Sequence, residues 1–169
     1  MKKILYVPNP ILRQKAKTIK KITSKEIDIS KKMIDMMLEA PGVGLAANQI
    51  GVLKKIITVN IKDPEDNDNI YVLFNPKISF YSKNKIIMEE GCLSLPQQYA
   101  EIERSEEIIV EYHNEKNEKI EQKKIGFEAR VLQHEIDHLH GKLFVDYLSS
   151  LKRNILIKKV KKLEKMGEI

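Results

Sequence analysis

The order of helix-like and strand-like segments along the chain limits the possible fold more than any other sequence feature. Between about residues 55 and 125, short β-branched and aromatic runs alternate with polar turns, and helical periodicity appears on either side. The runs read KIITVNI, IYVLF, KISFY, KIIME, EEIIVEY and KIEQKKI. Such runs are typical of antiparallel strands. Because helices and strands stand in separate blocks, the sequence predicts an α+β fold.

Three segments have the spacing of amphipathic helices. The first begins at Thr23, because Thr23 and Glu26 have the spacing of a capping box, and it ends near Pro41. The other two helices are expected at about residues 127–140 and 150–166.

Length and composition predict one soluble domain covering residues 1–169. With 42% hydrophobic residues, the chain can bury one core but is too short for two.

No run approaches the roughly 18 apolar residues that cross a bilayer, so no membrane contact is expected. The apolar stretch at residues 4–7 is too short for a signal peptide. One cysteine allows no intrachain disulfide, and the predicted location is therefore the cytoplasm.

The positive charge is concentrated at one end. Residues 150–169 contain seven basic and two acidic side chains, and they carry +5 of the net charge of +6. Such a helix can attract an anionic partner such as nucleic acid. It can equally be a helix whose lysines face water while an apolar stripe packs on the core. That stripe is expected to contain Leu151, Ile155, Val160 and Leu163.

The strongest chemical motif is the run H-E-I-D-H at residues 134–138. Histidines four residues apart lie on one helix face, so His134 and His138 can bind one metal ion, and Glu135 can reach a metal-bound water. In isolation the same run also fits two polar residues on an ordinary amphipathic helix, so the rest of the sequence must decide.

A catalytic metal site with two histidines needs a third protein ligand. The single cysteine, Cys92, lies in the sequence EGCLSLP at residues 90–96. Alone, such a cysteine is more often a small buried hydrophobic side chain than a ligand. One of the 24 acidic residues is the alternative third ligand.

The small residues at positions 42–49, which read GVGLAANQ, let the backbone approach a ligand closely. They do not form a P-loop, because no Gly-Lys-Ser or Gly-Lys-Thr follows. Two interpretations stay open: a tight turn before the first strand, and a site where the amide of Gln49 stabilises developing negative charge.

Together these segments resemble the peptide deformylase family. The resemblance rests on GVGLAANQ at 42–49, EGCLS at 90–94 and QHEIDH at 133–138, in that order. PNPILR near the start and GKLFVDYLS at 141–149 extend it over nearly the whole chain. It implies an α+β fold in which antiparallel strands surround a central H-E-x-x-H helix, with a further helix at the C-terminus.

The resemblance implies a metallohydrolase that removes the N-formyl group from the initiator methionine of nascent peptides and releases formate. The family's third ligand is the cysteine of the middle segment, so Cys92, His134 and His138 are expected to hold one divalent ion. Fe²⁺ is the first choice and Zn²⁺ the alternative. Glu135 is expected to accept a proton during attack on the formyl carbon and to pass it to the departing amine.

Further roles also follow from the resemblance. The metal, the side-chain amide of Gln49 and the backbone N–H of Leu93 are expected to stabilise the oxyanion. Glu90 and Asp137 are expected to contact the ligands from outside, with Arg104 as their cation. The residues implied for binding methionine, which could also be plain core, are Val43, Gly44, Met88, Phe127 and Val131.

One position departs from the family pattern. Tyr99 stands where a basic or small residue is common, in the rim expected to meet the peptide after methionine. The implied substrates are formyl-Met nascent peptides, with ribosome contact through the basic C-terminal helix, and the chain is expected to be a monomer. Two other hypotheses are a zinc endopeptidase that uses H-E-x-x-H and a nucleic-acid-binding module with a structural metal.

Overall fold

A computed structural model describes residues 3–169 of the chain. The helices are α1 (Ser24–Glu39), α2 (Gly126–Leu139) and α3 (Ser150–Lys165), with 3₁₀ turns η1 (Pro10–Arg13), η2 (Ala47–Ile50) and η3 (Phe144–Tyr147). The strands are β1 (Gly44–Ala46), β2 (Ile56–Asn60), β3 (Ile70–Tyr81), β4 (Lys85–Cys92), β5 (Leu95–Ser105), β6 (Glu107–His113) and β7 (Lys119–Ile125). The predicted α+β class is confirmed.

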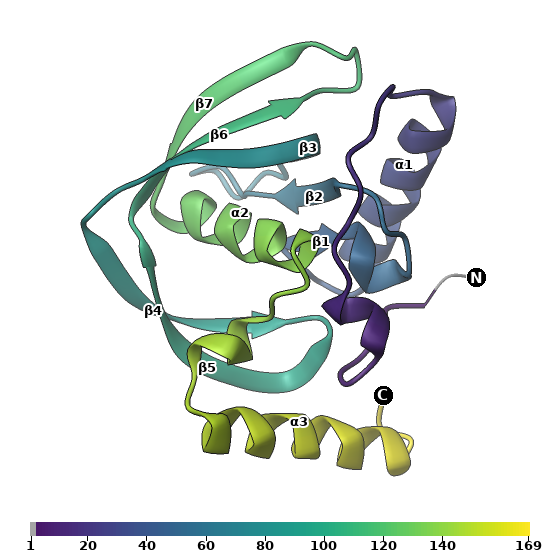
Figure 1. Cartoon of the computed structure of the whole chain (residues 1–169), viewed down its shortest axis with the longest axis vertical. Coiled ribbons are helices and arrows are strands. Elements are labelled where there is room, and N and C mark those ends of the chain that lie inside the picture. Colours follow the sequence, from purple (N-terminus) through teal and green to yellow (C-terminus); the bar gives the residue numbers. More distant parts are fainter. Residues whose placement is uncertain (1–2) are drawn as a thin grey trace.

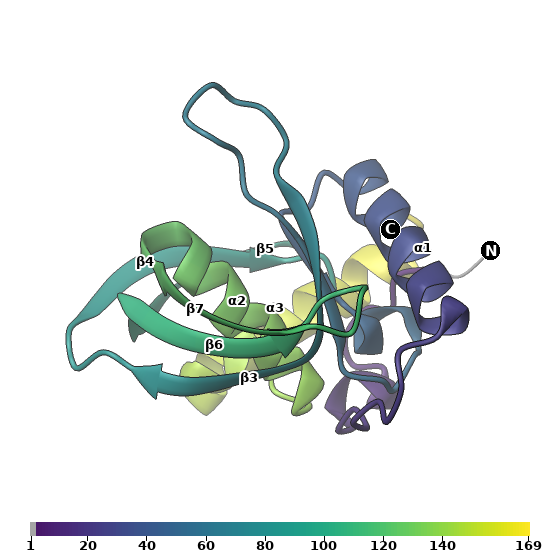
Figure 2. The same ribbon diagram turned by 90° about the horizontal axis from the view of Figure 1, so that it is seen from above.

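The strands form two antiparallel sheets around α2. The larger sheet has the order β1-β2-β3-β6-β7, and β4 pairs with β5 alone. In Figure 1, α2 lies between the larger sheet and the β4–β5 pair, with α3 on the outer side of that pair. Seen from above, β6 and β7 pass in front of α2, and β3 runs alongside β6 (Figure 2). The core between them includes Leu73, Ile108, Val131 and Leu132. This confirms the predicted central position of the H-E-x-x-H helix.

Helix α1 begins where the capping box predicted. The Glu26 carboxylate accepts hydrogen bonds from the Thr23 backbone N–H at 2.9 Å and from its hydroxyl at 2.5 Å. Met33 and Met37 are fully buried in the core cluster that α1 shares with β2. Capping and this apolar face together attach α1 beside the larger sheet.

The acid stability of the fold is expected to depend on Glu26. Its bonds to Lys54, first, and to Thr23 lower the pKa of Glu26 from 4.5 to about 2. A carboxyl group with a lowered folded-state pKa stabilises the fold above pH 4.5, and this contribution is lost as the pH falls from about 4.5 to 2. We expect Glu26→Gln to reduce the free energy of unfolding by about 1 kcal/mol at pH 7. Urea unfolding of both proteins at stepped pH should show that the difference in their free energies of unfolding vanishes near pH 2. A difference that stays constant with pH would contradict the lowered pKa of Glu26.

Two expectations about strands need correction. IYVLF and KISFY are not two strands but one, β3, whose pairing with β6 shifts register between Phe74 and Lys77. Asn75, at a φ of +52°, makes this irregularity, and a positive φ is a conformation that asparagine tolerates. Residues 44–46 were expected as part of a turn or ligand-binding loop, yet they form β1, the edge strand beside β2.

The apolar stripe predicted for the last helix is only partly right. Val160 is fully buried, with Leu156 and Ile157 packed on the same cluster. Leu151 and Ile155 are instead 70% and 44% exposed. The helical period that places residues 156 and 160 against β5 turns residues 151 and 155 to another face. Among the helices of residues 3–169, none is both long and apolar enough to span a bilayer.

Candidate metal centre

Three side chains converge at one end of β4. Cys92 is the last residue of that strand, and His134 and His138 lie one turn apart on α2. One ligand atom from each lies within 4.8 Å of the other two. The histidine ring centroids are 5.1 Å apart, and Cys92 Sγ lies 3.3 Å from His138 Nε2. Two imidazoles and a thiol at this spacing suit a divalent transition metal.

Local structure explains this convergence. Gly126 has a φ of +60°, a conformation that glycine adopts readily, and it joins β7 directly to α2. On the other side, the pairing of β4 with β5 changes register between Gly91 and Cys92. Such an irregularity redirects a side chain, and Cys92 lies beside the histidines of α2.

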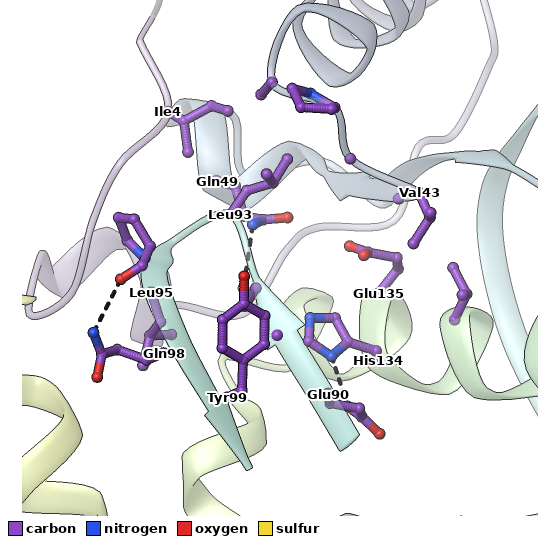
Figure 3. Close-up of a pocket in the computed structure, with 18 of the residues that line it drawn as sticks. Ile4, Val43, Gln49, Glu90, Leu93, Leu95, Gln98, Tyr99, His134 and Glu135 are labelled. Atoms are coloured by element: carbon purple, nitrogen blue, oxygen red, sulfur yellow. Dashed lines mark hydrogen bonds and ion pairs between the residues drawn. The ribbon is translucent and has the colours of Figure 1, made fainter. Parts of the chain in front are cut away.

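Glu90 is not one of the three candidate ligands, but its carboxylate contacts His134. His134 Nδ1 donates to Glu90 Oε1 at 2.9 Å (Figure 3). Arg104 donates to the same carboxylate at 2.6 and 2.9 Å and to Asp137 at 2.9 Å. Burial raises the pKa of Glu90, but the bonds from His134 and Arg104 outweigh it and lower the pKa to about 2. Because Nδ1 is engaged, Nε2 of His134 is the nitrogen left for a metal.

The two histidines differ in their preferred charge. Burial, with the nearby positive charge of His134, lowers the pKa of His138 well below its ordinary value. Burial acts on His134 in the same direction, but bonds to Cys92 and Glu90 outweigh it and raise its pKa. Metal binding requires neutral imidazoles, so we expect His134 to release a proton when an ion binds.

Glu135 is a carboxyl group poised near neutral pH. Its side chain is 4% exposed, and this burial raises the pKa of Glu135 to about 7 despite the opposing charge of His134. Within residues 3–169, its Oε2 has no hydrogen-bond partner. A group with such a pKa can accept a proton and return it at neutral pH.

An amide group lies close to the three candidate ligands. Gln49 is held in η2, where its Oε1 accepts from the Ala46 N–H at 2.9 Å. Its Nε2 donates to Ser94 Oγ at 3.1 Å and lies 3.6 Å from Cys92 Sγ. Leu93 follows Cys92 in the turn between β4 and β5. Gln49 and Leu93 therefore lie together beside the candidate ligands.

A cavity of about 610 Å³ opens at this group (Figure 3). Its wall includes Gln49, Cys92, Leu93, His134 and Glu135, together with four of the residues predicted to bind methionine, Val43, Gly44, Phe127 and Val131. Met88 is not part of this wall; it lies on β4 opposite Ile102. Sequence reasoning missed several wall residues, among them Ile4, Tyr6, Gln98 and Arg130.

Comparison with known proteins identifies the family. The family model described as polypeptide deformylase matches residues 1–154. The chain belongs to this family. The peptide deformylase of Pelagibacter ubique is 46% identical over 166 residues, which cover 97% of this chain and 95% of that protein. The peptide deformylase of Bartonella henselae is 40% identical over 162 residues, covering 96% and 92% respectively.

Solved structures agree with the family assignment. The crystal structure of peptide deformylase from Ehrlichia chaffeensis has a TM-score of 0.93 and 36% identity, and the match covers 98% of each chain. The same enzyme in complex with actinonin has a TM-score of 0.91 and 37% identity, covering 95% of this chain and 96% of that one. The predicted family and fold are confirmed, and the chain is an enzyme of the peptide deformylase type, a hydrolase.

Close packing at Gly44 yields a prediction for deformylase activity. A Cβ atom added at Gly44 would lie 2.5 Å from Glu135 Oε1 and 2.8 Å from its Cγ. We expect Gly44→Ala to displace Glu135 and lower kcat at least about 10-fold, since small misplacements at a reacting centre are costly. At Gly91, an added Cβ would meet the Tyr99 ring at 2.7 Å, but this ring is 60% exposed and can move. Gly91→Ala should therefore lose less activity, and equal losses would contradict this account.

Proposed function

We propose that the chain hydrolyses the N-formyl group of formylmethionine at the start of newly made proteins and releases formate, using one bound divalent ion. The observation that carries this proposal is the approach of Cys92, His134 and His138, whose ligand atoms lie within 4.8 Å of one another. Beside them lies the buried carboxyl group of Glu135, at the wall of a cavity. The family membership of the chain supports the same chemistry.

The donor set fits the proposed ion. A thiolate and two imidazole nitrogens are ligands that Zn²⁺ and Fe²⁺ both accept. We keep Fe²⁺ as the first choice and Zn²⁺ as the alternative. When bound, the ion supplies a Lewis acid that makes water a stronger nucleophile and polarises the formyl oxygen.

Glu135 is proposed to move the proton. With a pKa raised to about 7 by burial, it can accept a proton from the water that attacks the formyl carbon. It then returns this proton to the methionine nitrogen as the C–N bond breaks, so that the amine leaves neutral and formic acid forms, which loses its remaining acidic proton to give formate. Gln49, through its side-chain N–H, and Leu93, through its backbone N–H, are proposed to stabilise the negative charge on the formyl oxygen.

The apolar part of the cavity is proposed to bind the methionine side chain. Val131 is 5% exposed, whereas Val43 and Phe127 are 45% and 50% exposed and can be covered by a substrate. Gly44 packs tightly against Glu135 and leaves no room for a side chain of its own, so it contributes backbone to the cavity wall. Met88 lies outside the cavity wall and is 38% exposed. It stays a candidate for contact with a substrate side chain that reaches beyond the cavity.

The substrate test separates this proposal from an endopeptidase. Purified chain is incubated with formyl-Met-Ala-Ser and with an unformylated protein substrate, and free amine, formate and internal cleavage are measured. We expect deformylation of the tripeptide with internal peptide bonds intact. Cleavage of internal bonds without formate release would favour the endopeptidase.

We also propose that α3 holds the enzyme near its substrate on the ribosome. Lys158, Lys159, Lys161 and Lys162 are exposed on this helix, and ribosomal RNA is a dense anionic surface. Changing these four residues to glutamine should leave turnover of a short formylated peptide unchanged and abolish salt-sensitive co-sedimentation with ribosomes. A matched control changes four exposed lysines elsewhere, Lys20, Lys21, Lys31 and Lys32. Unchanged co-sedimentation of the α3 variant would refute the proposal.

A further inference from the structure

A buried arginine lies next to the candidate metal centre. Arg130 precedes His134 by one turn of α2, so both side chains lie on the same helix face. It is 4% exposed and forms part of the cavity wall. Its guanidinium donates to Glu90 Oε2 at 2.5 Å, to the Ile102 carbonyl at 2.9 Å and to the Ile86 carbonyl at 2.6 Å. One side chain therefore joins α2 to both β4 and β5.

The Glu90 carboxylate is held at both of its oxygens. Oε1 accepts from His134 Nδ1 at 2.9 Å and from Arg104 Nη2 at 2.9 Å. Oε2 accepts from Arg104 Nε at 2.6 Å and from Arg130 Nη1 at 2.5 Å. Charge-assisted bonds of this kind fix orientation as well as charge. Without Arg130, Oε2 would keep one donor, and the carboxylate plane would be held less firmly against His134.

The two arginines are not equivalent. Arg104 divides its donors between Glu90 and Asp137, so two carboxylates balance its charge. Arg130 has Glu90 as its one carboxylate partner in residues 3–169, and its other bonds go to backbone carbonyls. A buried guanidinium needs such a partner, because an unpaired buried charge is strongly unfavourable. The orientation of Glu90 and the burial of Arg130 therefore depend on each other.

We propose that Arg130 is a positioning residue for the metal centre, acting through Glu90 on His134. It holds the carboxylate that receives the Nδ1 hydrogen of His134, and so it keeps Nε2 turned toward Cys92 and His138. The inference rests on the metal site of the proposed function. A merely structural role, in which Arg130 only ties the strand carbonyls to α2, is the competing explanation.

Metal affinity provides a test that does not depend on catalysis. We would measure Zn²⁺ affinity of the purified full chain by competition with a chelator, and record the visible spectrum of the Co²⁺-substituted protein. Arg130→Met should weaken Zn²⁺ binding about 10-fold, because changes to groups that support metal ligands typically cost 10–100-fold in affinity. It should also shift the Co²⁺ bands.

Lys124→Met is the matched control. Lys124 also pairs with a carboxylate, that of Glu128 at 2.8 Å, and its bonds involve neither Glu90 nor a candidate ligand. This variant should leave the Co²⁺ spectrum and Zn²⁺ affinity unchanged. Circular dichroism and thermal unfolding verify that each variant is folded. If Arg130→Met does not fold, the same Zn²⁺ affinity and Co²⁺ spectrum are measured for Arg130→Lys, which keeps a positive charge near Glu90.

A double-mutant cycle decides between the positioning and structural roles. If Arg130 acts through Glu90, Arg130→Met should change Zn²⁺ affinity less than 2-fold, on the order of the error, in a Glu90→Gln background. An equal loss in both backgrounds would overturn the inference, as would unchanged affinity and spectrum in Arg130→Met alone. Failure of the wild-type chain to bind Zn²⁺ or Co²⁺ would overturn the proposed metal site and this inference with it.

Discussion

Glu135→Gln is expected to lower the deformylation rate at least about 10³-fold while the chain keeps its metal. Proton transfer by a positioned side chain typically contributes 10²–10⁴-fold to a rate, and here one group is proposed to act in both the attack and the departure steps. Glutamine has nearly the same shape, so it removes the proton transfer without removing a ligand. The variant should lose kcat with little change in KM, because the cavity wall keeps its volume.

Turnover and metal content must be measured on the same preparation of Glu135→Gln. Glu128→Gln is a suitable control, because Glu128 is on the same helix but binds Lys124 at 2.8 Å and does not line the cavity. This control should retain the wild-type rate. Stoichiometric metal with a wild-type rate in Glu135→Gln would rule out Glu135 as the proton acceptor.

Cys92→Ala is expected to lose its metal and, with it, nearly all activity. Two histidines would remain as protein ligands, and a catalytic site of this kind needs three. Changes to supporting groups alone cost 10–100-fold in affinity, so loss of a ligand should cost at least about 100-fold. Metal analysis after dialysis should find the wild type and Glu135→Gln loaded and Cys92→Ala empty.

Full metal content in Cys92→Ala would contradict ligation by Cys92 and would favour a carboxylate as the third ligand. In the described structure, Glu90 is one such candidate, since it contacts His134 directly. Its two bonds from Arg104 and its lowered pKa argue that it supports the ligands instead. Retained metal in Glu90→Gln would then show that Glu90 supports the ligands and is not itself the third ligand.

Local signals made much of this fold predictable. The capping box of Thr23 and Glu26 marked the start of α1, because it uses bonds that form within one turn. The spacing of His134 and His138 placed both rings on one face of α2 for the same reason. Such features depend on residues close in sequence, and a single sequence contains them directly.

Features that depend on distant residues were not predictable in this way. Residues 44–46 become a strand only because β2 provides a partner, and Leu151 is exposed because β5 contacts a different face of α3. The residue pattern around Cys92 left its role open, and the family resemblance indicated ligation. Arg130 carried no recognised motif, although its spacing of four residues from His134 could have indicated a shared face.

Formate release tests the central claim most directly. The chain is stripped of metal, and its activity on formyl-Met-Ala-Ser is measured before and after Fe²⁺ or Zn²⁺ is restored under anaerobic conditions. We expect no formate from the stripped chain, and after restoration as much formate as free Met-Ala-Ser, with Fe²⁺ more effective than Zn²⁺. Equal activity of the stripped and restored chain, or no formate with either ion, would contradict metal-dependent deformylation.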